Sequence, residues 1–249
     1  MLKPAEVLAL NAHRPWALPQ GKWQFYMAWQ RAVFLHWPAD PGELRKFVHP
    51  DLEIDLFEGQ PWVSMVAFDM VRVRPRNLIP FLPLSNFPEL NVRTYLRSGD
   101  KTGVYFLSLE AGKRGSAWFS NKISGLPYRF SRMSRDDRSY HSRNKPQNEY
   151  FSIEYTPGAI RAQKQPLDTW LTERYAVFQD SRGQLVEYEV HHEEWPIREI
   201  EISRLEYDYP RYRGLLQGPP RAAHYSDGVH VVTWGREVLE GGESERVRE

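Results

Sequence analysis

The stretch F-P-E-L-N-V-R-T-Y-L-R at residues 87–97 decides the fold, together with the segment that follows it as far as Met133. After a turn at 98–100 the chain continues G-V-Y-F-L-S-L-E at 103–110 and then S-G-L-P-Y-R-F-S-R-M at 124–133. The alternation predicts two paired strands followed by a short helix. Gly125 and Pro127 then fix the entry of a further strand.

The first of these strands has one apolar and one polar face, because successive side chains of a strand point to opposite sides. Val92, Thr94 and Leu96 share one face, and Asn91, Arg93, Tyr95 and Arg97 share the other. A strand with four large polar groups on one side lies against water or lines a polar cavity.

Composition narrows the class of protein. The chain has 249 residues, 26% of them charged, a net charge of +1 and no cysteine. It can therefore bury a sizeable core, has no disulfide or thiolate metal site, and has no overall charge that attracts nucleic acid. The 14% of aromatic residues favours a β-rich fold. We find neither a signal peptide nor an apolar run long enough to span a membrane, and we expect a cytoplasmic protein.

The rest of the chain predicts a single domain at residues 1–240 and a polar tail at 241–249. Residues 13–19 predict an extended arm, and Asp40-Pro41-Gly42-Glu43 is typical of a helix start. Further strands are expected at 23–29, 52–57, 62–70, 174–178, 185–190 and 199–205, and near Tyr140 and Phe151. A surface loop is expected at 72–86, a short helix at 166–171 and a hairpin turn at 180–183.

Several kinds of functional site lack their signatures. No glycine-rich phosphate loop and no G-x-S-x-G nucleophile motif is present, so no cofactor is predicted. His191 and His192 are adjacent on an expected strand and point to opposite faces, which argues against a shared metal ion, and no metal site is predicted. The arginines between residues 129 and 143 are interrupted by two aspartates, so a solvated face is favoured over nucleic-acid binding.

Arg93 is the centre of the best candidate site. Burying an arginine is costly unless it is paired or meets an anionic ligand, and Glu110 is the structural alternative to a ligand. An arginine beside tyrosine and amide groups suits a small carboxylate or carbonyl compound. The candidate ligand-binding residues are Asn91, Arg93, Tyr95, Glu110, Arg114, Tyr128 and His191.

Six sequence blocks resemble one known family. They are H-R-P-W (13–16), H-W-P-A-D-P (36–41), F-P-E-L-N-V-R-T-Y (87–95), G-L-P-Y (125–128), L-T-E-R-Y (171–175) and H-H-x-x-W-P (191–196). The chain is similar to the uncharacterised bacterial YqjF-like family, whose fold is similar to that of acetoacetate decarboxylase. The resemblance implies a β-rich α+β fold, with a partly closed antiparallel barrel, a few packed helices and an internal cavity.

The resemblance implies Schiff-base chemistry, but this chain has other residues where acetoacetate decarboxylases have their lysines. In acetoacetate decarboxylases a lysine pair follows a glycine–aromatic–proline turn, and one lysine forms a Schiff base with the substrate. Here Tyr128 and Arg129 follow the comparable turn, and Asn91 takes the place of an acidic residue. Lys122 precedes the turn and has no lysine neighbour, so a Schiff-base decarboxylase is not expected.

Three readings of function remain open. The first is a binding protein for a small organic acid or carbonyl compound. The second is a lyase or hydrolase that acts on a small keto acid without a covalent intermediate, with Glu110 or His191 as the base. The third is a structural or interaction protein whose barrel is filled by aromatic side chains. A homo-oligomer is compatible with all three, whereas a nucleic-acid or membrane partner is not expected.

Overall fold

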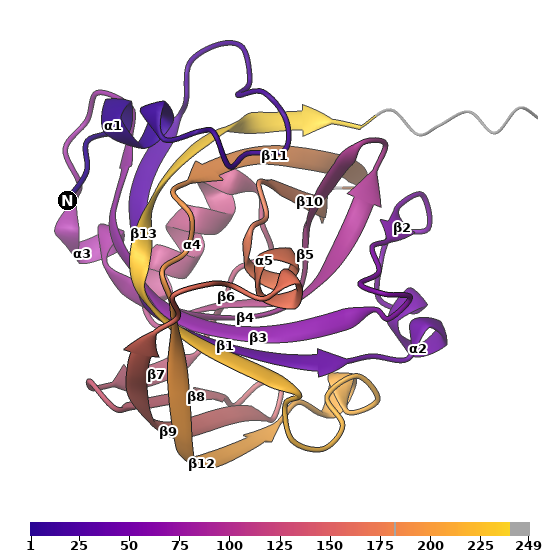
Figure 1. Ribbon diagram of the computed structural model, residues 1–249. Helices are drawn as coiled ribbons and strands as arrows, with labels where there is room; N and C mark the ends of the chain where they lie inside the picture. Colours follow the sequence, from indigo (N-terminus) through magenta and orange to yellow (C-terminus); the bar gives the residue numbers. More distant parts are fainter. Residues whose placement is uncertain (182, 240–249) are drawn as a thin grey trace, which may run out of the picture.

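Seven of the strands close into a barrel in the order β1–β3–β4–β5–β10–β11–β13 (Figure 1). This computed structural model describes residues 1–181 and 183–239. The barrel strands are β1 (Phe25–Pro38), β3 (Trp62–Pro75), β4 (Phe87–Ser98), β5 (Lys101–Ala111), β10 (Ala176–Ser181), β11 (Gln184–His192) and β13 (Ala222–Val238). Pairing of β1 with β13 closes the ring, and β5 and β10 form a parallel pair within it.

The same sheet continues outside the barrel. From β13 it passes through β12 (Ile197–Asp208), β9 (Glu149–Ile160) and β8 (Ser139–Asn144) to β7 (Arg132–Arg135). In Figure 1 these four strands form a second layer below the barrel, and the long strand β13 belongs to both parts. Two short strands, β2 (Glu53–Ile54) and β6 (Arg129–Phe130), pair with β4 and β5.

The helices are short. They are α1 (Pro4–Ala9), α2 (Pro41–Arg45), α3 (Leu82–Ser85), α4 (Arg114–Ser124), α5 (Pro166–Thr172) and the 3-10 helix η1 (Pro210–Tyr212). The predicted start of α2 is confirmed, because the Asp40 side chain accepts a hydrogen bond of 2.8 Å from the Glu43 amide. Figure 1 shows α4 and α5 within the ring of strands, and their side chains Ala117 and Leu171 join the apolar cluster inside the barrel. None of the described helices is long and apolar enough to cross a bilayer.

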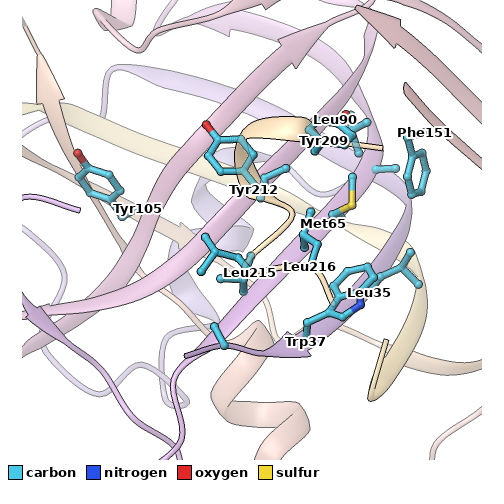
Figure 2. Packing of buried hydrophobic residues seen from close by; sticks show 14 of the residues in the cluster. Leu35, Trp37, Met65, Leu90, Tyr105, Phe151, Tyr209, Tyr212, Leu215 and Leu216 are labelled. Atoms are coloured by element: carbon cyan, nitrogen blue, oxygen red, sulfur yellow. The ribbon is translucent and has the colours of Figure 1, made fainter. Parts of the chain in front are cut away.

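Two large apolar cores lie on the two faces of the barrel wall. The inner core fills much of the barrel, and the outer core joins the barrel to the second layer. Figure 2 shows the outer core, where Leu35, Met65 and Leu90 of the barrel wall meet Phe151 of β9. The faces of β4 follow the predicted alternation, since Val92 and Leu96 belong to the outer core and Tyr95 to the inner one.

A bulge reverses the alternation inside β1. Trp29 packs against the inner core, whereas further along Phe34, an even-numbered residue, is an inner residue as well. Between them the β1–β3 register shifts between Gln30 and Val33, and Arg31 has a positive φ of 52°. An extra residue at such a bulge turns the following side chains to the opposite face.

The strand-rich fold and most elements agree with the sequence prediction, with four corrections. Strand β1 extends nine residues past Trp29, to Pro38, and β11 continues through His191 and His192. The expected strand at 52–57 is reduced to β2. The end of β3 and the helix α3 occupy much of the loop expected at 72–86. The predicted β10–β11 hairpin forms, with Ser181 paired to Gln184. Its turn contains residue 182, and the expected tail begins beyond residue 239; both lie outside the described residues.

Candidate functional site

A cavity of about 170 Å³ lies inside the barrel and is here called the central cavity. Inward-facing side chains of β1, β3, β4 and β11 form its walls, and residues of α4 and of the segment that follows α5 contribute to its lining. Most of these side chains are aromatic or aliphatic. The polar minority includes Glu89, Asn91, Arg93, Tyr128, Arg174 and His192.

Glu89 is the buried carboxyl group of the central cavity. Its Oε2 accepts a hydrogen bond of 2.8 Å from the Tyr128 hydroxyl, and its Oε1 accepts one of 3.2 Å from the Asn91 amide. Burial raises the pKa of Glu89 to about 7, although Tyr128, Asn91 and the charge of Arg93 act in the opposite direction. Burial and the neighbouring carboxyl group raise the pKa of Tyr128 well above its ordinary value, so the phenol stays protonated.

Arg93 and Arg174 bring positive charge to the cavity. The Arg93 Nη2 group donates a long hydrogen bond of 3.4 Å to the carbonyl of Leu171. Arg174 is held more firmly, because its Nη1 donates to Asp55 at 2.7 Å and its Nε donates to the Trp170 carbonyl at 2.6 Å. Both arginines are among the residues that line the cavity.

Four cavity-lining residues carry a buried polar atom without a hydrogen-bond partner among the described residues. These atoms are Trp29 Nε1, Asn91 Oδ1, Arg93 Nε and Arg174 Nη2. A buried polar atom that lacks a partner costs free energy, so such groups gain when a bound molecule completes their hydrogen bonds. Three of the four are N–H donors, which suits an acceptor such as a carboxylate or carbonyl oxygen.

His192, and not the predicted His191, lines the cavity. His191 points outward, where its Nε2 lies 3.1 Å from the carbonyl oxygen of Val7 in α1, and burial lowers its pKa to about 4. The two rings are on opposite faces of β11, as the sequence predicts for adjacent strand residues. His192 continues the face of β11 that carries Val186, Tyr188 and Val190 of the inner core.

Tyr95 lies on the predicted inner face but belongs to a buried hydrogen-bond chain and not to the cavity lining. Its hydroxyl lies 2.6 Å from Ser64 Oγ, which lies 2.6 Å from His36 Nδ1. The chain continues from His36 Nε2 to His224 Nδ1 at 3.1 Å and from His224 Nε2 to Asp168 Oδ1 at 2.8 Å. This chain links β4, β3, β1 and β13 to α5 across one end of the barrel.

The carboxylate of Asp168 sets the direction of this chain. Burial opposes its ionisation, but Arg161, the Gln165 amide and His224 lower its pKa. An ionised carboxylate only accepts hydrogen bonds, so each group donates toward Asp168, beginning with the Tyr95 hydroxyl. Tyr95, predicted as a ligand-binding residue, therefore lies at the donor end of this chain and outside the cavity lining.

Glu110 and Arg114 are also outside the central cavity. Glu110 lies on the opposite side of the barrel wall, where Arg129 Nη2 donates to it at 3.1 Å and to Glu149 at 2.8 Å. The structural alternative in which Glu110 pairs with Arg93 is therefore not what the structure shows. Arg114 is exposed, with its guanidinium 4.4 Å from the ring centroid of Phe130. Of the seven predicted residues, the cavity brings together Asn91, Arg93 and Tyr128.

A second hollow, of about 230 Å³, lies on the outer face of β5. Arg129 contributes to its lining, together with Tyr212 and Arg211. The Arg129 guanidinium is already paired with Glu110 and Glu149, and Arg211 is exposed. The second hollow therefore offers a ligand less unsatisfied hydrogen-bonding capacity than the central cavity.

The described part of the chain places no lysine in the lining of the central cavity. Lys122 is exposed on α4, while Phe119, Ser120 and Ile123 of the same helix line the cavity. Within the described residues there is also no group of three acidic, histidine or cysteine side chains arranged to hold a metal ion.

We expect no covalent adduct between the protein and a keto acid, because a Schiff base requires an amine at the cavity. Incubation with pyruvate or acetoacetate followed by borohydride reduction should leave the intact mass of the protein unchanged. An increase in mass that maps to a lysine would contradict this placement of the lysines.

Comparison with known proteins places the chain in a family. Residues 26–230 match the family DUF2071, described as an uncharacterised conserved protein. The uncharacterised protein YqjF of Bacillus subtilis (strain 168) is 36% identical over 228 residues, which cover 88% of this chain and 93% of YqjF. The chain belongs to the DUF2071 family.

Solved structures show the fold of this DUF2071 member. The enduracididine biosynthesis enzyme MppR complexed with pyruvate matches with a TM-score of 0.63 and 12% identity, over 92% of this chain and 94% of that one. Acetoacetate decarboxylase from Legionella pneumophila matches with a TM-score of 0.59 and 13% identity, over 96% and 98% of the two chains. At these identities the likeness concerns the fold alone, and it confirms the predicted acetoacetate decarboxylase-like architecture.

Sequence reasoning missed two polar residues of the cavity. Glu89 precedes Asn91 by two positions and therefore shares its face of β4, so extending the alternation by one step would have found it. His192 continues the alternation of Val186 and Val190, which belong to the inner core, so extending the predicted strand by two residues would have found it.

Proposed function

We propose that this DUF2071 member binds a small carboxylate or carbonyl compound in the central cavity without forming a covalent bond to it. The observation that carries the proposal is that four residues of the cavity lining, Trp29, Asn91, Arg93 and Arg174, each carry a buried polar atom without a hydrogen-bond partner among the described residues. Arg93 is the anion anchor, because its guanidinium has one long hydrogen bond and no carboxylate within salt-bridge distance among the described residues. MppR, which shares the fold, has been solved with pyruvate bound.

Glu89 and Tyr128 would orient the other end of the polar group. Below pH 7 Glu89 is largely protonated and can donate a hydrogen bond to a ligand oxygen. Above pH 7 its negative charge opposes a bound carboxylate, so affinity for carboxylates should fall as the pH rises. A cytoplasmic location is part of this proposal, and a chain without cysteine fits a reducing compartment.

A second candidate function is proton transfer at a carbon next to a carbonyl group. Glu89 favours it, because a carboxyl group with a pKa of about 7 serves as an acid or a base near neutral pH. The Glu89 carboxylate would take the proton from the carbon, and the negative charge on the resulting enolate oxygen would face Arg93. The predicted bases Glu110 and His191 lie outside the cavity, so Glu89 replaces them in this scheme.

Thermal unfolding against a panel of carboxylates and keto acids tests the binding proposal. A ligand at about one hundred times its dissociation constant should stabilise the wild type by roughly 2.7 kcal/mol. Arg93→Gln removes a charged hydrogen-bond donor, which is worth about 1.5–3 kcal/mol, and should therefore weaken binding by roughly 10- to 150-fold.

Arg114→Gln is the matched control, because it removes the same charge from an exposed position outside the cavity. It should leave the dissociation constant unchanged. The proposal fails if no acid stabilises the wild type, or if both variants lose the same affinity.

A further inference from the structure

Three polar residues of the central cavity lie on one strand. Glu89, Asn91 and Arg93 follow one another at every second position of β4, and Tyr128 donates to the first of them. We call these four residues the polar stripe. A ligand that uses Arg93 therefore has its polar end against β4.

Apolar side chains border the polar stripe on both sides. On β3 the register neighbours of Glu89 and Asn91 are Phe68 and Val66, and on β5 the neighbour of Arg93 is Phe106. All three line the cavity. A short hydrophilic acid placed on the stripe would leave these surfaces uncovered.

The size of the cavity limits the apolar part of the ligand. The volume of about 170 Å³ is close to that of an engineered cavity of about 150 Å³ that binds benzene. Because the acid group occupies part of the same space, we expect an apolar body of about the size of a benzene ring to be the largest that fits well, and a fused double ring to fit less well.

We propose that the ligand is a carboxylic or 2-oxo acid with an apolar body comparable in size to a benzene ring, such as an arylalkyl or medium-chain acid. This inference rests on the proposed function, since it assigns the acid group to the polar stripe. The apolar body lies against Val66, Phe68 and Phe106. Each methylene that leaves water for this surface is worth about 0.8 kcal/mol, or roughly fourfold in affinity.

Calorimetric titration with a series of 2-oxo acids at pH 6.5 tests the inference. From pyruvate to 2-oxohexanoate the chain grows by three methylenes, so the dissociation constant should fall by roughly 60-fold. Phenylpyruvate should bind at least as tightly as 2-oxohexanoate, and naphthylpyruvate should bind more weakly than phenylpyruvate.

Two variants locate the apolar body. Val66→Phe fills the space beside Asn91 and should weaken binding of phenylpyruvate at least tenfold, with less than a threefold effect on pyruvate. Phe68→Leu opens the cavity and should shift the preference toward naphthylpyruvate, which keeps the test informative if Val66→Phe does not fold. Trp118→Ala is the control, because Trp118 is exposed on α4 and does not line the cavity. It should change neither the dissociation constant of phenylpyruvate nor that of pyruvate.

The outcomes separate this inference from the proposed function. Equal affinity for pyruvate, 2-oxohexanoate and phenylpyruvate would overturn the apolar-body inference and leave the anion site intact. Equal affinity for phenylpyruvate and for an uncharged analogue, with no effect of Arg93→Gln, would overturn the anion site and leave the apolar cavity. Absence of binding by every compound would overturn both.

Discussion

Replacing Asp55 by alanine is expected to lower the free energy of unfolding by about 3–5 kcal/mol, because it leaves a buried arginine without its counter-charge. Asp55 and Arg174 are both almost completely buried, and their side chains form an ion pair of 2.7 Å. The guanidinium also packs over the rings of Tyr95 and Trp170, at 4.8 and 4.2 Å from their centroids. Urea unfolding at constant pH measures the loss.

Arg97→Ala is the control for this prediction, because it removes the other cation paired with Asp55. Arg97 lies 3.0 Å from Asp55, but its side chain is 46% exposed, so water screens the pair and its loss should cost no more than about 1 kcal/mol. The double change Asp55→Ala and Arg174→Met should recover part of the loss, since it removes the buried charge itself. Similar costs for Asp55→Ala and Arg97→Ala would contradict the assignment of a buried charge pair.

The second large effect is a dependence of stability on pH that comes from Glu89. Its pKa rises from an ordinary value of 4.5 to about 7 in the folded protein. Below pH 4.5 both the folded and the unfolded chain hold the proton, so Glu89 has no effect on stability. Between pH 4.5 and 7 only the unfolded chain releases it, so stability falls as the pH rises, and the loss is complete above pH 7. The difference between the two pKa values corresponds to a loss of about 3 kcal/mol in the free energy of unfolding.

Unfolding of the wild type and of Glu89→Gln at pH 5, 6, 7 and 8 measures this contribution. The wild type should lose stability relative to Glu89→Gln across this range, and the difference between them isolates Glu89 from other carboxyl groups. The comparison with Glu89→Gln is needed because burial also raises the pKa of Glu149 to about 7, so Glu149 contributes to the pH dependence of both proteins. Parallel profiles of the two proteins would show that Glu89 titrates in the same way when folded and unfolded.

The polar face of β4 was predictable because period-two alternation is a local property of the chain. It placed Asn91 and Arg93 together, and Tyr128, which follows the turn at Gly125 and Pro127, was named as a candidate ligand-binding residue. These three residues reach the central cavity. The same local pattern extends to Glu89, which was available from the sequence.

The remaining part of the site depends on features that a single sequence does not display. The bulge at Arg31 reverses the inner face of β1. Glu110 was assigned to the site because it lies in the same polar-rich stretch as Arg93. A register shift between β4 and β5 at Val92 and Arg93 gives β5 an extra residue, so Glu110 faces outward, next to Arg129. Pairings across the barrel, such as Asp55 with Arg174, join residues far apart in sequence.

The most direct test of a ligand site in the barrel is a crystal structure of the protein with phenylpyruvate. We predict that the carboxylate lies within hydrogen-bond distance of Arg93, with the ring in the central cavity beside Phe68 and Phe106. Density for the ligand in the hollow outside β5, beside Arg129 and Tyr212, would contradict the account. So would a central cavity occupied only by water in crystals of a protein that binds phenylpyruvate in solution.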